Sequence, residues 1–75
     1  MDNKHFDEYL RLGLNVRYYR RLRDLTQENL AEAVNISREH ISRIETAANC
    51  ASLDVLFDIA EVLQVPVNKF FEFRD

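Results

Sequence analysis

The stretch LTQENLAEAVNISREHISRIE, residues 25–45, contains nearly the same six-residue phrase twice, at residues 25–30 and again at 36–41. Thr26 and Ser37 stand where a side-chain oxygen can accept hydrogen bonds from the unpaired amides of a first helical turn. In both copies one apolar residue precedes this cap and another lies four positions beyond it, which is the pattern of a hydrophobic staple. The stretch therefore predicts two helices that start eleven residues apart.

The first of these helices has room only from Gln27 to about Val34 before the second cap arrives. Asn35 lies between the helices, and Asn accepts a left-handed backbone more readily than most residues. A connection this short forces the helices to cross steeply, which is typical of a helix-turn-helix unit and weakens the alternative of an ordinary helical hairpin. Neither helix has Glu or Gln at its third position, so a capping box is not expected.

Helical patterns also flank this unit. From about Phe6 to Arg23 the apolar residues recur at spacings of three and four. Gly13 weakens that helix by about 1 kcal/mol relative to Ala, and marks either its true start or a place where another element packs closely. Ser52 caps a further helix, SLDVLFDIAEVLQ, and the following VNKFFEF predicts a last short helix or turn.

Composition favours one compact helical domain over residues 1–75, because 47% of the residues are apolar and there is one Gly and one Pro. Within it we expect the helix-turn-helix unit at about 26–46 and a frayed N-terminus at 1–8. Cys50 is the single cysteine, so no disulfide framework is possible. The chain lacks a signal-peptide pattern and an apolar run of membrane-spanning length, which predicts a cytoplasmic protein without a membrane partner.

The net charge of −3 conceals an uneven distribution. Residues 11–43 carry seven arginines against four acids, a balance of +3, whereas the segments on either side are acidic. This asymmetry indicates an anionic partner for the middle segment or, alternatively, a solvated helix face.

The second helix of the pair has a distinct outer face. With about 100° between successive residues, Ile41 and Ile44 point inward, and the side chains that point outward are Glu39, Ser42, Arg43 and Thr46, with Arg38 and His40 on the flanks. In a major groove Arg can hold guanine through two hydrogen bonds and Glu can accept from cytosine. The plainer alternative is that Glu39 and Arg43, four apart, form a surface ion pair.

From about Leu12 to Phe71 the chain resembles the helix-turn-helix regulators of the phage repressor and Cro type, also called the xenobiotic-response-element type. The resemblance is carried by LGLNVRYYR, LTQENLAEAVNIS, ISRIE and SLDVLFDIAEVL. It implies an all-α, compact five-helix fold in which the second and third helices form the DNA-binding unit. Three residues depart from the family pattern: Asn35 and Ala47 replace glycines and Ala51 replaces a proline.

The resemblance also implies roles for individual residues. Four residues occupy the base-reading places: Arg38, Glu39, Ser42 and Arg43. Four more are expected to contact phosphates or the DNA backbone: Gln27, Ser37, His40 and Asn49. Arg20 and Glu45 occupy places where family members form a partly buried ion pair, so Arg20 is expected to support the fold.

We predict a sequence-specific DNA-binding transcriptional regulator that acts on double-stranded DNA as a homodimer, with a protein co-regulator as a further possible partner. Four phenylalanines are candidates for the dimer interface: Phe57, Phe70, Phe71 and Phe73; the alternative is that they fill the core of one monomer. An enzyme is not expected, because a single Gly excludes a Gly-rich phosphate loop and no Cys/His spacing suits zinc, so neither a cofactor nor a metal is predicted. The competing hypothesis is a protein-interaction module or antitoxin-like adaptor of the same fold.

Overall fold

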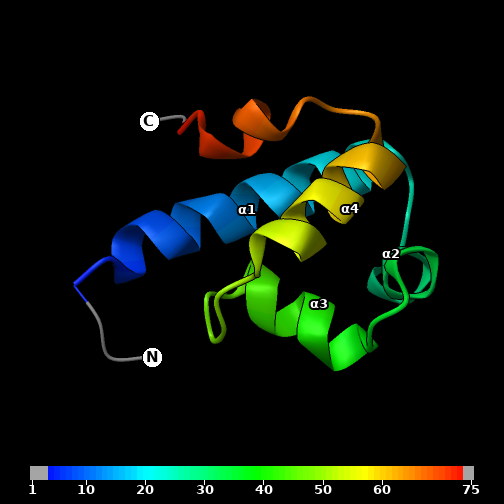
Figure 1. The fold of residues 1–75 in the computed structure, drawn as a ribbon, viewed down its shortest axis with the longest axis horizontal. Helices are drawn as coiled ribbons and strands as arrows, with labels where there is room; N and C mark the ends of the chain where they lie inside the picture. Colours follow the sequence, from blue (N-terminus) through cyan, green and yellow to red (C-terminus); the bar gives the residue numbers. More distant parts are fainter. Residues whose placement is uncertain (1–3, 74–75) are drawn as a thin grey trace.

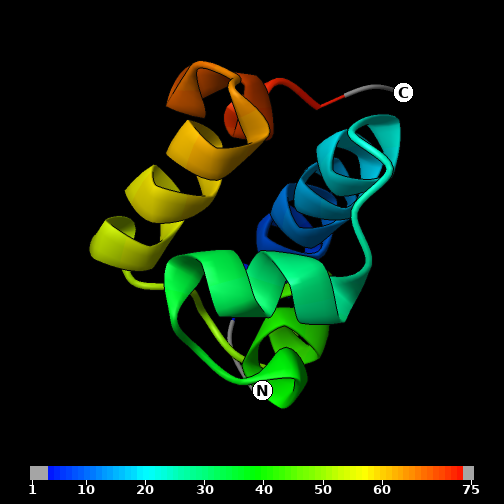
Figure 2. The ribbon, with the colours of Figure 1, turned by 90° about the vertical axis from the view of Figure 1, so that its right-hand side faces the viewer.

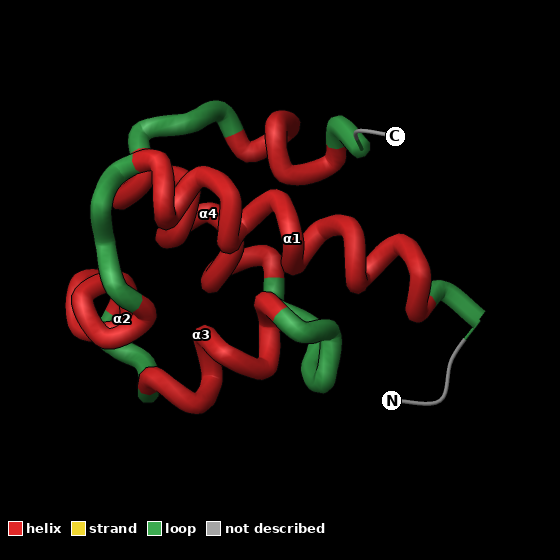
Figure 3. Tube along the Cα trace, turned by 180° about the vertical axis from the view of Figure 1, so that it is seen from behind, coloured by secondary structure: helices red, strands yellow, loops and turns green. Residues whose placement is uncertain are grey.

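The computed structural model describes residues 4–73 as an all-helical bundle. Its elements are α1 (Phe6–Leu22), α2 (Gln27–Val34), α3 (Arg38–Glu45), α4 (Leu53–Leu63) and a 3₁₀ helix, η1 (Val67–Phe71). No strand occurs in this described part of the chain (Figure 3). The all-α prediction is therefore confirmed, but the count of five α-helices is wrong, because there are four and the fifth element is a 3₁₀ helix.

The helices α1 and α4 lie between α3 on one side and η1 on the other (Figure 1). Figure 1 shows α3 below α1 and α4, whereas η1 lies over α1 on the side away from α3. α2 is seen end-on in Figure 1 and lengthwise in Figure 2, so it crosses α3 steeply. Asn35 makes this turn possible, because it ends α2 in the left-handed conformation with φ 60°. The sequence pattern predicted both this turn and the bounds of α2.

The starts of the two helices follow the repeated phrase. The Thr26 hydroxyl accepts from the backbone N–H of Asn29 at 2.9 Å, and the Ser37 hydroxyl accepts from that of His40 at 3.1 Å. The side chain of Asn29 also accepts from the backbone N–H of Thr26 at 3.1 Å. This completes a capping box on α2, which we had not expected, because the shorter Asn side chain reaches the cap as Glu or Gln would.

A single apolar core joins all five elements. Its largest fully buried side chains include Leu30 of α2, Ile41 of α3 and Phe70 of η1. Phe70 has no exposed surface and its ring lies 6.1 Å from that of Tyr19. The prediction that Phe70 lies on a dimer interface is therefore wrong, because this ring fills the core of the monomer.

Two polar side chains that the sequence patterns did not single out fix the C-terminal half. Asn15 is buried and donates to the backbone carbonyls of Phe70 at 2.9 Å and Glu72 at 3.1 Å. Arg23 donates from Nε to the carbonyl of Leu63 at 2.7 Å, one of the carbonyls that the end of α4 leaves without a helical partner. Both contacts join residues 40 or more positions apart in the sequence.

The N-terminal helix is longer than the expected fraying of residues 1–8 allows. α1 already begins at Phe6, and the acidic Asp7 and Glu8 in its first turn suit the positive end of the helix dipole. Residues 1–3 of that segment lie outside the described residues. Within the described part, no helix combines the length and the apolar character needed to cross a membrane.

Candidate nucleic-acid interface

The outer face of α3 carries the predicted base-reading residues. Ile41 and Ile44 are buried in the core, which turns the opposite face of the helix outward. On that face Arg38, Glu39 and Arg43 are exposed, and Ser42 is half-buried. The eight-residue helix thus presents two guanidinium groups, a carboxylate and a hydroxyl, a set that can both donate to and accept from base edges.

A hydrogen-bond network anchors this helix to α1 and α2. Arg20 of α1 donates to both carboxylate oxygens of Glu45, at 2.7 and 3.1 Å, and to the carbonyl of Leu25 at 2.7 Å. Gln27 donates to the same carboxylate at 3.0 Å and accepts from Arg38 at 3.4 Å. The pair of Arg20 and Glu45 is buried, whereas Arg38 is exposed, so the network leads from the core to the outer face of α3.

The network gives Gln27 a position at the boundary between α2 and α3. Gln27 is the first residue of α2, where the backbone N–H groups and the helix dipole favour an anion. Its side chain is half-buried and already spans Glu45 and Arg38. A phosphate contact by Gln27 would therefore be made beside the first turn of α3.

The remaining predicted contact residues lie around the same helix. Ser37 is exposed but its hydroxyl caps α3, while His40 is half-buried. Glu39 and Arg43 do not form an ion pair with each other within residues 4–73. Both side chains therefore remain available to a ligand on the outer face.

The loop after α3 contains one residue, Ala47, in a strained left-handed backbone conformation. Ala47 is fully buried and has φ 65°, a conformation that costs an L-residue with a Cβ about 1–2 kcal/mol. Two hydrogen bonds hold the loop against α3, because the backbone amides of Ala48 and Asn49 both donate to the carbonyl of Arg43, at 2.8 and 3.2 Å. Asn49 is exposed at the turn, beside the C-terminal end of α3.

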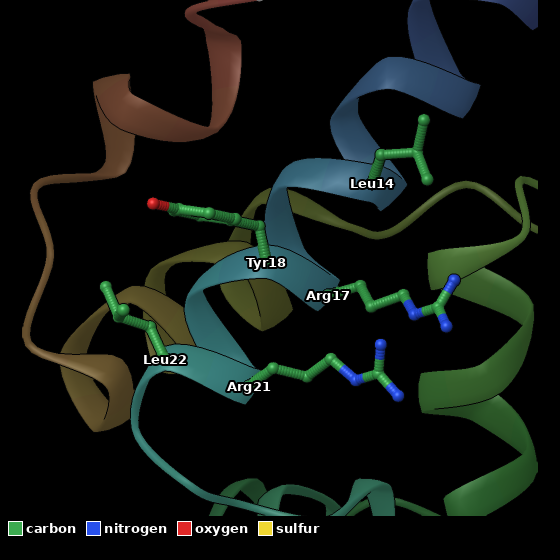
Figure 4. Close-up of a pocket in the computed structure, with 5 residues that line it drawn as sticks. All are labelled: Leu14, Arg17, Tyr18, Arg21 and Leu22. Atoms are coloured by element: carbon green, nitrogen blue, oxygen red, sulfur yellow. The ribbon is translucent and has the colours of Figure 1, made fainter.

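The surplus of arginines in residues 11–43 serves more than one purpose. Arg20 and Arg23 hold α3 and α4 in place. Arg11 forms an exposed ion pair with Asp7 at 3.2 Å. Arg17 and Arg21 extend from α1 toward α3 (Figure 4). Only part of the positive charge counted in the sequence therefore lies on α3 itself.

Comparisons with known proteins agree on the type of fold. A family model described as helix-turn-helix matches residues 16–70. The HTH-type transcriptional regulator MJ0272 of Methanocaldococcus jannaschii is 38% identical over 60 residues, which is 80% of this chain and 91% of that protein. Across the curated relatives the chain spans between 45% and 91% of their lengths.

Two solved structures are similar to the described bundle. The restriction-modification controller protein C.AhdI from Aeromonas hydrophila superimposes with a TM-score of 0.87 at 23% identity, covering 92% of this chain and 100% of that one. PlcR of Bacillus thuringiensis, in a complex with the peptide PapR7 and DNA, is 39% identical with a TM-score of 0.77. That match covers 85% of this chain and 22% of PlcR.

Proposed function

This chain belongs to the helix-turn-helix family of DNA-binding transcriptional regulators, and we propose that it recognises an inverted-repeat operator as a homodimer through the outer face of α3. It is a regulator and not an enzyme. The observation that carries the proposal is the pair of exposed guanidinium groups of Arg38 and Arg43 on a helix whose other face is locked into the core. Such a regulator would act in the cytoplasm, where it meets its operator.

Base reading would be divided among four side chains of α3. Arg38 lies in the first turn, the end of a recognition helix that approaches the bases most closely. Either arginine can donate two hydrogen bonds to guanine, and Glu39 can accept from the amino group of cytosine. Ser42 offers one hydroxyl that both donates and accepts. Each well-placed bidentate contact discriminates against the wrong base by about 1–3 kcal/mol.

The contacts that position the helix would come from the residues around it. Gln27 and Ser37 lie at the N-termini of α2 and α3, where a phosphate is favoured electrostatically. His40 flanks the helix and Asn49 lies at its C-terminal end. These contacts would fix the register of α3 on the duplex and would add affinity that does not depend on sequence.

A homodimer is proposed because one short helix reads too few base pairs to select a single genomic site. Two copies would place their α3 helices in successive major grooves, roughly 34 Å apart. Phe57 of α4 and Phe71 of η1 are 51% and 50% exposed, and this apolar surface supports their assignment to a dimer interface. Leu53, one turn before Phe57, is 63% exposed and extends the same apolar face. Phe73 is half-buried, with its ring 5.9 Å from the Arg11 guanidinium, and contributes less surface.

The DNA-binding role is tested by titrating a labelled random-sequence duplex with the protein at increasing salt. We expect binding that weakens steeply with salt, and a double variant, Arg38→Ala with Arg43→Ala, that binds more weakly and with a shallower salt slope. Lys4→Ala removes an exposed positive charge far from α3 in sequence and is the matched control. Equal binding by the double variant and the control would contradict the role of α3, and absence of DNA binding throughout would favour the adaptor hypothesis.

The dimer is tested by sedimentation equilibrium of Phe57→Glu, which puts a charge on the proposed interface. We expect this variant to dissociate at concentrations where the natural protein is dimeric. Ala33→Glu adds the same charge at an exposed position of α2 and should leave the dimer intact. A dimer unaffected by Phe57→Glu would contradict the assignment of this interface.

A further inference from the structure

An unbroken line of apolar side chains runs along the solvent side of α1. Its members are Leu10, Leu14 and Tyr18, here called the α1 ridge, and each is turned about 40° from the next; Phe6 and Leu22 continue the spacing but lie about 80° to either side of Leu14, outside the ridge. Leu10 is half-buried, and Leu14 and Tyr18 are 48% and 47% exposed. The helix already buries a different face, which includes Leu12 and Val16, in the core. The α1 ridge is therefore apolar surface beyond what the fold of one chain needs.

Side chains spaced four apart form the kind of ridge with which helices pack against one another. In Figure 4, Tyr18 and Leu22 point away from α3, Arg17 and Arg21 extend toward it, and Leu14 projects from the preceding turn of α1. Together these five residues line an open hollow of about 530 Å³. Adjacent exposed apolar side chains with a polar rim are typical of a protein–protein contact.

The charges beside the α1 ridge are arranged symmetrically about its centre. Leu14 is the middle member of the ridge, and Asp7 and Arg21 lie seven residues before and after it. At about 100° per residue, these two side chains lie about 20° to either side of the Leu14 direction. The Asp7 side chain is 72% exposed, and Arg21 is exposed as well. The face thus has an acid at one end and a base at the other, at equal distances from Leu14.

We propose that the α1 ridge is a self-association surface, on which the α1 helices of two copies pack antiparallel with their two-fold axis at Leu14. This arrangement sets Leu10 opposite Tyr18 of the second copy. It also sets Asp7 opposite Arg21 at both ends of the contact. A two-fold interface must be self-complementary in this way, whereas an unrelated partner would require no such symmetry.

This contact goes beyond the proposed operator-binding dimer and uses a separate surface. The dimer is assigned to Phe57 and Phe71 on α4 and η1, whereas the α1 ridge belongs entirely to α1. The α1 helix faces α3 through Gly13 and Arg20, about 100–120° around the helix from Leu14. Packing along the α1 ridge would therefore leave the outer face of α3 open and would join two dimers bound at neighbouring operators.

The position of the two-fold axis is tested by disulfide trapping. In a Cys50→Ser background, Leu14→Cys should form a covalent dimer under mild oxidation, because the axis puts residue 14 next to its own copy. The matched control is Ala33→Cys in the same background, an exposed position on α2 away from the ridge. Equal trapping of the two variants on a non-reducing gel would overturn the proposed axis.

The charge pairing is tested in a Phe57→Glu background, where the operator-type dimer is removed and any remaining association reports the α1 ridge. Asp7→Arg and Arg21→Asp should each weaken this association roughly tenfold, because each change puts like charges opposite each other at both ends. The two changes together should restore it. Circular dichroism verifies that each variant is folded.

The outcomes separate the two interfaces. A Phe57→Glu protein that is strictly monomeric, with no rescue by the double charge exchange, would overturn the α1 ridge while leaving the operator dimer standing. Association that is unchanged by Phe57→Glu but lost with Leu14→Glu would support the α1 ridge and contradict the α4 interface.

Discussion

Arg20 of α1 and Glu45 of α3 form a buried two-point ion pair, with nitrogen–oxygen distances of 2.7 and 3.1 Å. The same carboxylate accepts from Gln27, so one acidic group at the end of α3 ties that helix to both α1 and α2. Because its partners are fixed, the orientation of α3 is set before any ligand binds. A preorganised helix loses less conformational freedom on binding, which favours affinity.

Breaking this pair should destabilise the protein strongly. Glu45→Gln leaves the Arg20 guanidinium buried without a counterion, and removal of one partner of a buried pair costs about 3–5 kcal/mol. The free energy of unfolding from urea denaturation measures the effect. Asp7→Asn, which breaks the exposed pair with Arg11, is the control and should cost at most about 1 kcal/mol. Similar losses from the two substitutions would contradict the structural role of Glu45.

Gly13 should not tolerate a side chain. A Cβ at this position would overlap the carbonyl oxygen of Ile44 and lie 2.7 Å from that of Glu45, and both are backbone atoms. Gly13→Ala should therefore lower stability by about 1–3 kcal/mol, although Ala is the better helix former by about 1 kcal/mol. Ala33→Gly on exposed α2 measures the propensity effect separately. A Gly13→Ala protein more stable than the natural chain would show that α1 and α3 do not approach so closely.

Gln64 offers a position where glycine should stabilise. It ends α4 in the left-handed conformation with φ 59° and its side chain is exposed. Gln64→Gly removes the strain of the left-handed backbone but raises the conformational entropy of the unfolded chain. The net gain in stability should be about 0.5–1 kcal/mol. The contacts from Arg23 go to backbone carbonyls and would persist. Thermal unfolding shows whether Gln64→Gly raises or lowers stability. The control is Glu61→Gly, which lies inside the helix and should lose about 1 kcal/mol.

Gln27 and Arg38 should respond differently when binding to several operator sequences is compared. Arg38→Ala should reduce discrimination at one base position by about 1–3 kcal/mol. Gln27→Ala should instead weaken binding to all sequences alike, because a phosphate contact carries no direct sequence information. Competition titrations with single-base operator variants measure both effects. Discrimination that survives Arg38→Ala unchanged would remove Arg38 from the base-reading set.

Much of this fold could be predicted from local sequence rules. The caps at Thr26 and Ser37 and the left-handed turn at Asn35 depend on near neighbours in the chain, so the bounds of α2 and α3 followed directly. The buried position of Ile41 and Ile44 followed from helical periodicity, which also indicated the outer face of α3.

The features that could not be predicted depend on contacts between distant parts of the chain. Asn15 and Arg23 look like ordinary surface residues, yet they bind backbone carbonyls 40 or more positions away. Phe70 and Phe71 are adjacent and chemically identical, but the short 3₁₀ helix buries the first and exposes the second. Only the packing of η1 against α1 distinguishes them.

We propose that α3 reads DNA as one half of a symmetric pair. Selection from randomised DNA duplexes is the decisive experiment for this proposal. The purified full chain is mixed with the duplexes at near-physiological salt, and those that remain bound are sequenced. We expect an inverted repeat whose half-sites are about one helical turn apart. Recovery of no common sequence, with weak binding that disappears as salt rises, would contradict it and would mean that the arginines supply only general attraction to phosphates.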